Sequence, residues 1–190
     1  MNFMPALKIG IWNAWIFMSV FILQMMVIIF ARESIRKKSH VPKEVKQTKR
    51  DKYTGIIANV VWLIALGYSF FLPLKLNTIW FYTGLIIFII GLIIIILATY
   101  NFISTPSAQL ITKGIYTFSR HPMYLSTFFI CLGTGIASAS WIFIFISIIM
   151  ALFFYKEMLI EERFCLGKYG NSYKEYSERV PRWIGLPKKV

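Results

Sequence analysis

Long apolar runs dominate the first half of the chain. A helix needs about 20 apolar residues to span the hydrocarbon core of a bilayer. Residues 9–30, 54–72 and 79–100 form three runs of roughly this length. Residues 1–100 are therefore predicted to contain three membrane helices.

A fourth apolar stretch, residues 122–155, is too long for one span and short for two. Trp141 restarts the apolar run after a group of small residues, which let helix backbones approach closely. This pattern predicts a tight hairpin of two helices. The small residues are Gly133, Gly135, Ala137, Ser138, Ala139 and Ser140. The predicted fold class is all-α: a multi-pass membrane protein with five transmembrane helices, the last two forming the hairpin, plus a short cytoplasmic C-terminal helix.

Composition agrees with this pattern. Hydrophobic residues make up 57% of the 190 residues and charged residues 15%, against roughly 45–50% and about 25% in soluble domains. These values exclude a soluble enzyme, a disordered tail and a coiled coil. No internal repeat or long linker is visible, so residues 1–190 are expected to form a single integral membrane domain.

The distribution of charge sets the expected orientation. Segments 31–53, 101–121 and 156–190 hold 19 of the 21 Lys and Arg residues, whereas Lys8 and Lys75 fall on the other side. The positive-inside rule makes the basic face cytoplasmic, with the N-terminus outside and the C-terminus and any active site inside. The formal charge of +13 thus indicates anionic lipid as a partner and not nucleic acid.

The two cysteines give no sign of a disulfide or a metal site. Cys131 falls in a predicted membrane helix and Cys165 in a predicted cytoplasmic helix, without metal-type spacing. No metal is expected.

The first candidate for chemistry is the segment that ends in Arg120, His121 and Pro122. Proline suits the first position of a helix, and the free N–H groups of the next turn favour a carboxylate or phosphate. Arg120 and His121 add further donors. The alternative is a capped helix whose Arg and His contact lipid headgroups.

The second candidate is the pair Glu161–Glu162. At 1.5 Å per residue, the 20 residues from Trp141 to Glu161 cover about 30 Å, the thickness of the hydrocarbon core. The pair should therefore lie level with Arg120 and His121, where it could hold hydroxyl or ammonium groups of a ligand. The alternative is a solvated helix flank.

The third candidate is the tail. Gly170 is a plausible C-cap, the segment from Ser172 to Glu175 fits a capping box that opens a short helix, and Pro181 ends that helix. Three tyrosines at spacings of four and three could form a lid or pack as ordinary helix neighbours: Tyr169, Tyr173 and Tyr176.

Taken together, these elements resemble the isoprenylcysteine carboxyl methyltransferase / phospholipid methyltransferase family. The resemblance covers about 90 residues, 100–187. It rests on Gly114-Ile-Tyr-(x)3-Arg-His-Pro-Met-Tyr124, the apolar hairpin, Glu-Glu-(x)7-Gly170-(x)2-Tyr173-(x)2-Tyr176 and Val-Pro-Arg-Trp183. It implies an integral membrane enzyme that uses S-adenosylmethionine at the cytoplasmic face, with residues 101–190 as the cofactor-binding core.

The resemblance also implies roles for individual residues, with Arg120 and Glu162 as the catalytic candidates. Arg120 and His121 suit the methionyl carboxylate, and Glu161 suits the amino group or ribose hydroxyls. Tyr116 and the Leu110–Ile111 pair could sandwich adenine. The expected cofactor contacts are Asn101, Ala108, Gln109, Leu110, Ile111, Tyr116, His121, Pro122, Met123, Tyr124 and Glu161.

The acceptor is expected to be lipid-like or small and apolar, carrying an amine, thiol or carboxylate. It could enter sideways between the fourth and fifth helices. Relatives that methylate a prenylcysteine carboxylate have Arg one turn before the glutamate pair, where this chain has Glu157, next to Lys156. Lys156 and Glu157 are therefore the candidate substrate-binding residues, and the negative charge favours an amine, a thiol or another lipid over prenylcysteine.

Two other functions fit parts of the pattern. NADPH-dependent sterol-type reductases share the Arg-His-Pro-x-Tyr hairpin, and Cys165-(x)3-Tyr-Gly170 resembles their tail. The glutamate pair and the short chain argue against them. A non-enzymatic membrane scaffold would leave the convergence of three motifs on one face unexplained.

Overall fold

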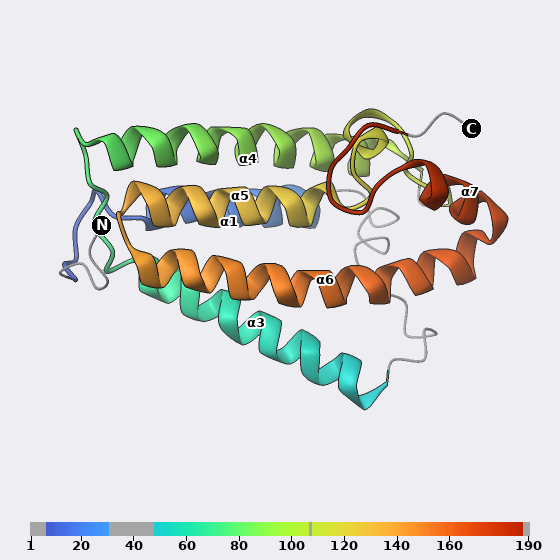
Figure 1. The fold of residues 1–190 in the computed structure, drawn as a ribbon, viewed down its shortest axis with the longest axis horizontal. Helices are drawn as coiled ribbons and strands as arrows, with labels where there is room; N and C mark the ends of the chain where they lie inside the picture. The colour runs from blue at the N-terminus through green and yellow to red at the C-terminus, as the bar shows by residue number, and fades with distance from the viewer. Residues whose placement is uncertain (1–6, 31–47, 107, 188–190) are drawn as a thin grey trace.

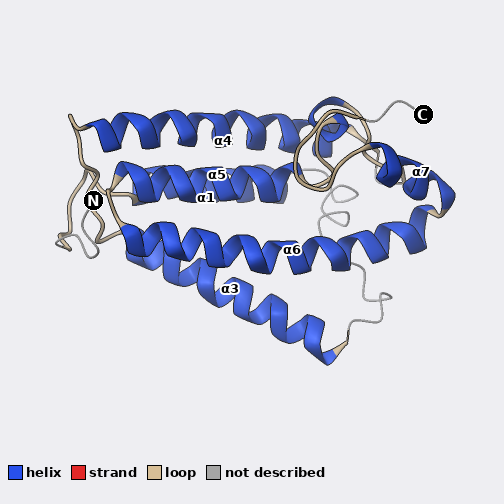
Figure 2. Ribbon diagram, in the orientation of Figure 1, coloured by secondary structure: helices blue, strands red, loops and turns tan. Residues whose placement is uncertain are grey.

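The computed structural model describes residues 7–30, 48–106 and 108–187, and within these ranges the chain is helical (Figures 1 and 2). The described part has no strand, only an isolated bridge between Asn13 and Pro73. The all-α prediction is therefore confirmed for this part of the chain. Its elements are α1 (Trp15–Phe30), α3 (Lys49–Ser69), α4 (Ile79–Ser104), the 3-10 turn η1 (Gly114–Thr117), α5 (Pro122–Ala137), α6 (Trp141–Tyr169) and α7 (Asn171–Arg179).

Five of these helices form one bundle and alternate in direction. Figure 1 shows α1, α4 and α6 running one way, and α3 and α5 the other. The first and last described residues consequently lie at opposite ends. The end that carries α7 also holds η1 and the beginning of α5.

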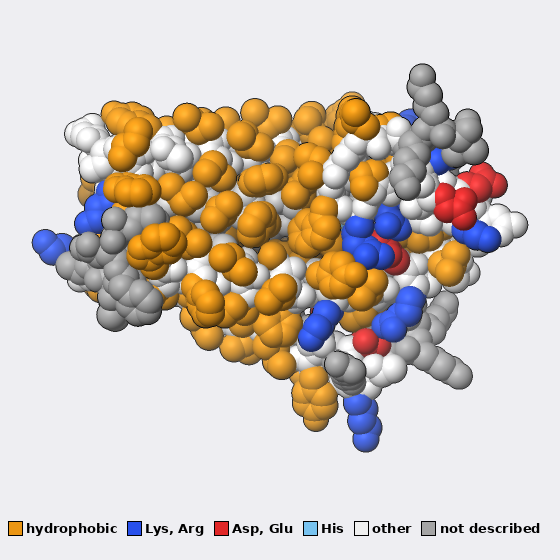
Figure 3. All heavy atoms as spheres, viewed as in Figure 1, with side chains coloured by type: hydrophobic (Ala, Val, Ile, Leu, Met, Phe, Trp, Pro, Cys, Tyr) orange, Lys and Arg blue, Asp and Glu red, His pale blue; other side chains and the backbone are white. Residues whose placement is uncertain are grey.

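The bundle surface is apolar along its length. In Figure 3, hydrophobic side chains cover the visible flank, and charged ones gather at the two ends, with the acidic ones at the α7 end. Among the described helices, α4 and α6 are long and apolar enough to cross a membrane, while α1 and α5 are shorter apolar helices. A contiguous exposed apolar surface of this extent marks contact with lipid or protein.

The first two predicted helices differ from the observed ones at their ends. The prediction that the first begins at residue 9 was wrong: α1 begins at Trp15. The buried Asn13 side chain donates to the carbonyls of Lys8 and Phe70, at 2.5 and 2.6 Å, and this holds the preceding segment in a turn. The second helix, α3, begins at Lys49 behind a Thr48–Asp51 capping box and ends at Ser69.

The predicted hairpin is present, and its small residues serve two interfaces. A Cβ on Gly133 would lie 2.6 Å from the backbone nitrogen of Phe88 in α4, and one on Gly135 would lie 2.9 Å from Ile144 in α6. The two backbones of α4 and α5 therefore touch. Ser140 caps α6 by accepting from the Phe143 N–H.

At the tail, Gly170 ends α6 with a positive φ of 56°, as expected. The predicted capping box at Ser172 was wrong. Helix α7 begins at Asn171, so that Gly170 and not Ser172 is its N-cap residue, and it has no side-chain cap. It ends at Arg179, two residues before Pro181.

Candidate functional site

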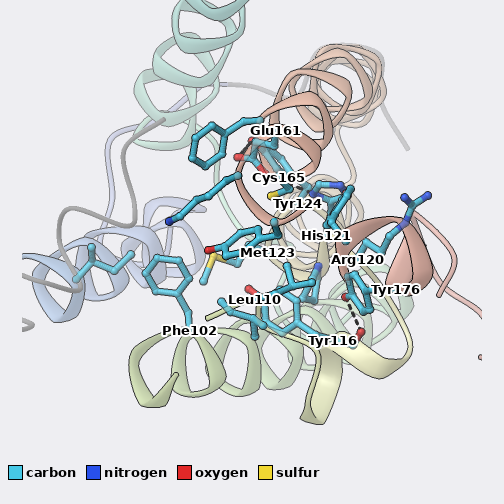
Figure 4. A pocket seen from close by; sticks show the side chains of 17 residues that line it. Phe102, Leu110, Tyr116, Arg120, His121, Met123, Tyr124, Glu161, Cys165 and Tyr176 are labelled. Atoms are coloured by element: carbon cyan, nitrogen blue, oxygen red, sulfur yellow. Dashed lines mark hydrogen bonds and ion pairs between the residues drawn. The ribbon is translucent and has the colours of Figure 1, made fainter. Parts of the chain in front are cut away.

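A cavity of about 340 Å³ lies at the α7 end of the bundle, lined by α5, α6, α7, the segment that leads into η1 and the ends of α1 and α4 (Figure 4). Its size falls in the range of small-molecule sites, about 300–1,000 Å³. Its wall is mostly apolar and aromatic, with a few charged side chains. Nine predicted site residues line it: Leu110, Ile111, Tyr116, Arg120, His121, Pro122, Met123, Tyr124 and Glu161.

Three predicted cofactor residues lie beside the cavity and not in its lining. Asn101 supports η1: its Oδ1 accepts from the Ile115 N–H at 3.2 Å, and its amide leaves no room for a Cβ on Gly114. Ala108 and Gln109 are exposed. The Gln109 carbonyl accepts from the Tyr169 hydroxyl at 3.4 Å. Asn101 therefore positions the turn that carries Tyr116.

The two predicted substrate residues also lie outside the cavity lining. Lys156 is exposed, with its Nζ 5.8 Å from the centre of the Phe153 ring. Glu157 faces α3, where a Cβ on Gly55 would lie 3.5 Å from its Oε1. That oxygen is buried and has no hydrogen-bond partner in the described chain.

Glu161 supplies the negative charge of the cavity. The Tyr124 hydroxyl donates to its Oε1 at 2.8 Å, and its Oε2 lies 3.4 Å from Nδ1 of His121. The side chain is 38% exposed, so it can still accept from a ligand.

Glu162, one residue later, turns to the other side of His121. Its Oε1 lies 3.2 Å from both Arg120 Nη1 and His121 Nε2. Arg182 donates to both of its oxygens, at 2.8 and 2.7 Å. Glu162 therefore holds Arg120 and His121, which line the cavity, without lining it itself.

The His121 ring lies between the two carboxylates. Burial lowers the pKa of the imidazole, but its hydrogen bonds to Glu161 and Glu162 raise it, and the net result is a pKa above the ordinary value of 6.5. Both ring nitrogens donate only in the charged form. The geometry thus favours a histidine cation beside Arg120.

This end of the cavity is suited to an anion. Pro122 is the first residue of α5, and the N-cap residue His121 makes no side-chain cap. The Arg120 Nε is buried without a hydrogen-bond partner in the described chain. A ligand carboxylate here would meet that donor and the positive end of the α5 dipole.

The tail closes one side of the cavity. The Tyr176 hydroxyl donates to the Tyr116 carbonyl at 2.8 Å, and the backbone N–H of Arg120 donates to the Pro181 carbonyl at 3.0 Å. Burial raises the pKa of the Tyr176 hydroxyl, which keeps it neutral as a donor. The three tyrosines of the predicted lid all line the cavity, and two of them are buried.

Several site residues were missed by sequence reasoning. Phe164, Cys165 and Lys168 line the cavity with Glu161, and their spacing of three, four and seven places them on one helix face, a signal available from the sequence. Arg182 belongs to the tail motif Val-Pro-Arg-Trp183, but its position in the sequence predicts no role for it. Among the described residues, no group of three or more His, Cys, Asp or Glu side chains is arranged to hold a metal ion.

Comparison with known proteins shows which family the chain resembles. The family model for phospholipid methyltransferase matches residues 79–172. A protein-S-isoprenylcysteine O-methyltransferase from Schizosaccharomyces pombe is 33% identical over 78 residues, which cover 40% of this chain and 33% of that protein. One from Xenopus laevis is 33% identical over 82 residues, 43% of this chain and 28% of that protein.

The chain spans about a third of the length of these curated relatives. The segment matched by the family model includes α4, η1, α5 and all of α6, and with them every predicted residue that lines the cavity. On this evidence, the part of the chain that carries the cavity, residues 79–172, is similar to the phospholipid methyltransferase family.

Proposed function

We propose that this protein transfers a methyl group from S-adenosylmethionine to a lipid-like or small apolar acceptor at the cytoplasmic face of a membrane. One observation carries the proposal: a single cavity combines a cationic end, formed by Arg120 and His121, with the carboxylate of Glu161 and an apolar wall. S-adenosylmethionine combines a carboxylate, an ammonium group and a flat adenine, which this cavity matches.

The residues present fit that cofactor. Its carboxylate would satisfy the buried Arg120 Nε, which otherwise lacks a partner in the described chain, and buried polar groups are rarely left unpaired. Glu161 would accept from the amino group or the ribose hydroxyls. Leu110, Ile111 and Tyr116 would enclose the adenine.

The chemistry asks little of the side chains beyond alignment. When bound, S-adenosylmethionine supplies a methyl group on a positively charged sulfur. The chain holds donor and acceptor in line and excludes water. The buried tail residues Tyr173 and Tyr176 serve the second task, and no nucleophilic side chain is required.

The acceptor is proposed to meet the cavity from the membrane. Ile28 of α1 and Phe102 of α4 line it, and they offer an apolar surface to a hydrocarbon tail. Entry between α5 and α6 stays a prediction. The curated relatives are named for an isoprenylcysteine substrate. The acidic residue at position 157 is the reason from the sequence to favour an amine, a thiol or another lipid. Because Glu157 faces α3, its charge would act on the acceptor from outside the cavity lining.

The proposed topology is five membrane passes, with the N-terminus outside and the C-terminus and cavity in the cytoplasm. The alternating helix directions in Figure 1 and the 19-to-2 division of basic residues support it. The test is cysteine labelling of sealed vesicles. A cysteine placed in segment 48–53 that is labelled only from outside contradicts this topology.

Ligand binding in detergent tests the function. We expect S-adenosylhomocysteine, the demethylated product, to bind and NADPH not to bind. Binding of NADPH alone would refute the methyltransferase proposal and favour the sterol-type reductase.

A further inference from the structure

Arg182 lies in the tail beyond α7 and reaches back to α6. Its Nε donates to Oε1 of Glu162 at 2.8 Å, and its Nη2 donates to Oε2 at 2.7 Å. A guanidinium that meets both oxygens of a carboxylate fixes the orientation of that carboxylate as well as its position. The Glu162 side chain is only 13% exposed, so water has little access to replace this partner.

Arg182 is itself held in place. Its guanidinium lies over the Tyr155 ring, 5.2 Å from the ring centre, and its Nη1 donates to the Tyr155 hydroxyl at 3.2 Å. Its carbonyl accepts from the Ser119 hydroxyl at 3.3 Å. The tail is thus fastened to both α6 and the loop that carries Arg120.

The consequence reaches the cavity through Glu162. The oxygen that accepts from the Arg182 Nε, Oε1, also lies 3.2 Å from Arg120 Nη1 and from His121 Nε2. Without Arg182, the carboxylate would be free to rotate and to draw Arg120 and His121 toward itself. Both cations would then be displaced from the end of the cavity that suits an anion.

We infer that Arg182 is a positioning residue, which sets the affinity for S-adenosylmethionine by orienting Glu162 and, through it, Arg120 and His121. The inference rests on the proposed function, and it adds a residue that does not line the cavity. The apolar side of the cavity at Ile28 and Phe102 lies outside this network, so the KM for the acceptor should not change.

The test measures the affinity of the full chain for S-adenosylhomocysteine by calorimetry in detergent. Arg182→Ala should weaken binding by about ten-fold, the loss of one charge-assisted contact. Millimolar guanidinium should restore binding to this variant and leave the wild type unchanged. Arg182→Lys should fall in between, because an ammonium cannot make the two-pronged contact.

The matched control is Arg163→Ala. Arg163 also pairs with a carboxylate, Asp51, but it is exposed on α6, away from the cavity lining. This variant loses the same charge and should bind like the wild type.

The outcomes separate the inference from the proposed function. If the wild type does not bind, the proposed function fails. If it binds and Arg182→Ala binds equally well, the positioning role is refuted and the function stands. A loss that neither guanidinium nor lysine restores, in a variant with unchanged helix content, also refutes the positioning role.

Discussion

Replacing Glu161 by glutamine removes one negative charge from the cavity and leaves the shape of the side chain nearly unchanged. The Tyr124 hydroxyl can still donate to the amide oxygen, as it does to Oε1 at 2.8 Å. The substitution therefore removes mainly the charged hydrogen bond between the Glu161 carboxylate and the ligand. A hydrogen bond to a charged group contributes about 1.5–3 kcal/mol, which corresponds to roughly ten- to hundred-fold in affinity.

The partial exposure of Glu161 places the expected loss toward the lower part of that range. Its side chain is 38% exposed, and water screens a charge at such a site. We therefore expect the affinity for S-adenosylhomocysteine to fall by about ten- to thirty-fold. The assay is calorimetry in detergent, beside thermal unfolding of the same sample.

Glu175→Gln is the matched control, since Glu175 is an exposed acid on α7 that does not line the cavity. It should bind like the wild type. A folded Glu161→Gln protein with unchanged affinity would show that Glu161 does not contact the cofactor. The proposal that its carboxylate binds the amino group or the ribose hydroxyls would then be refuted.

Three further predictions follow from the packing and the charges. The His121 pKa is raised on folding, so its contribution to stability is present below pH about 6.5 and is lost as the pH rises through the higher folded value. His121→Gln should therefore remove this part of the pH dependence of the melting temperature. An unchanged pH dependence in the variant would contradict the raised pKa of His121. Gly133→Ala should destabilise the bundle by about 1–3 kcal/mol through overpacking, because its Cβ would meet the α4 backbone, whereas Gly167→Ala, with nothing within 4 Å, should not; equal thermal unfolding would refute the close contact. Like charges about 4 Å apart repel by roughly 4 kcal/mol at a dielectric near 20, which corresponds to roughly a thousand-fold in rate or affinity. Because Glu157 lies outside the cavity lining, its repulsion of a carboxylate acceptor should be weaker. Glu157→Arg should therefore raise methylation of a farnesylcysteine analogue, but by less than about a thousand-fold. Efficient methylation of this analogue by the wild type would contradict the substrate argument.

Local signals predicted most of the helical framework. The apolar runs predicted the helices of the bundle, although only α4 and α6 among the described ones are long and apolar enough to cross a membrane. The small residues between Gly133 and Ser140 predicted the hairpin. The beginning of α1 was not predictable, because Asn13 is held by the Phe70 carbonyl, 57 residues away in sequence. A hydropathy pattern carries no information about such a contact.

The candidate site also has features that the sequence predicts and features that it does not. The length of the helix from Trp141 predicted that Glu161 lies level with Arg120 and His121, and the structure brings all three to one cavity. The separate directions of Glu161 and Glu162 were not predictable, since adjacent residues on a helix point about 100° apart and only the position of Arg182 decides which one is tied down. Glu157 faces α3 for a similar reason: the packing partner, and not the spacing from the glutamate pair, sets its direction.

The most direct test of the central claim is an experimental structure of the full chain bound to S-adenosylhomocysteine. The account predicts the ligand in the cavity between α5, α6 and α7, with its carboxylate within hydrogen-bonding distance of Arg120 and the first turn of α5, and its amino group or ribose beside Glu161. A ligand bound elsewhere, or bound in this cavity with its carboxylate away from Arg120 and α5, would contradict the account.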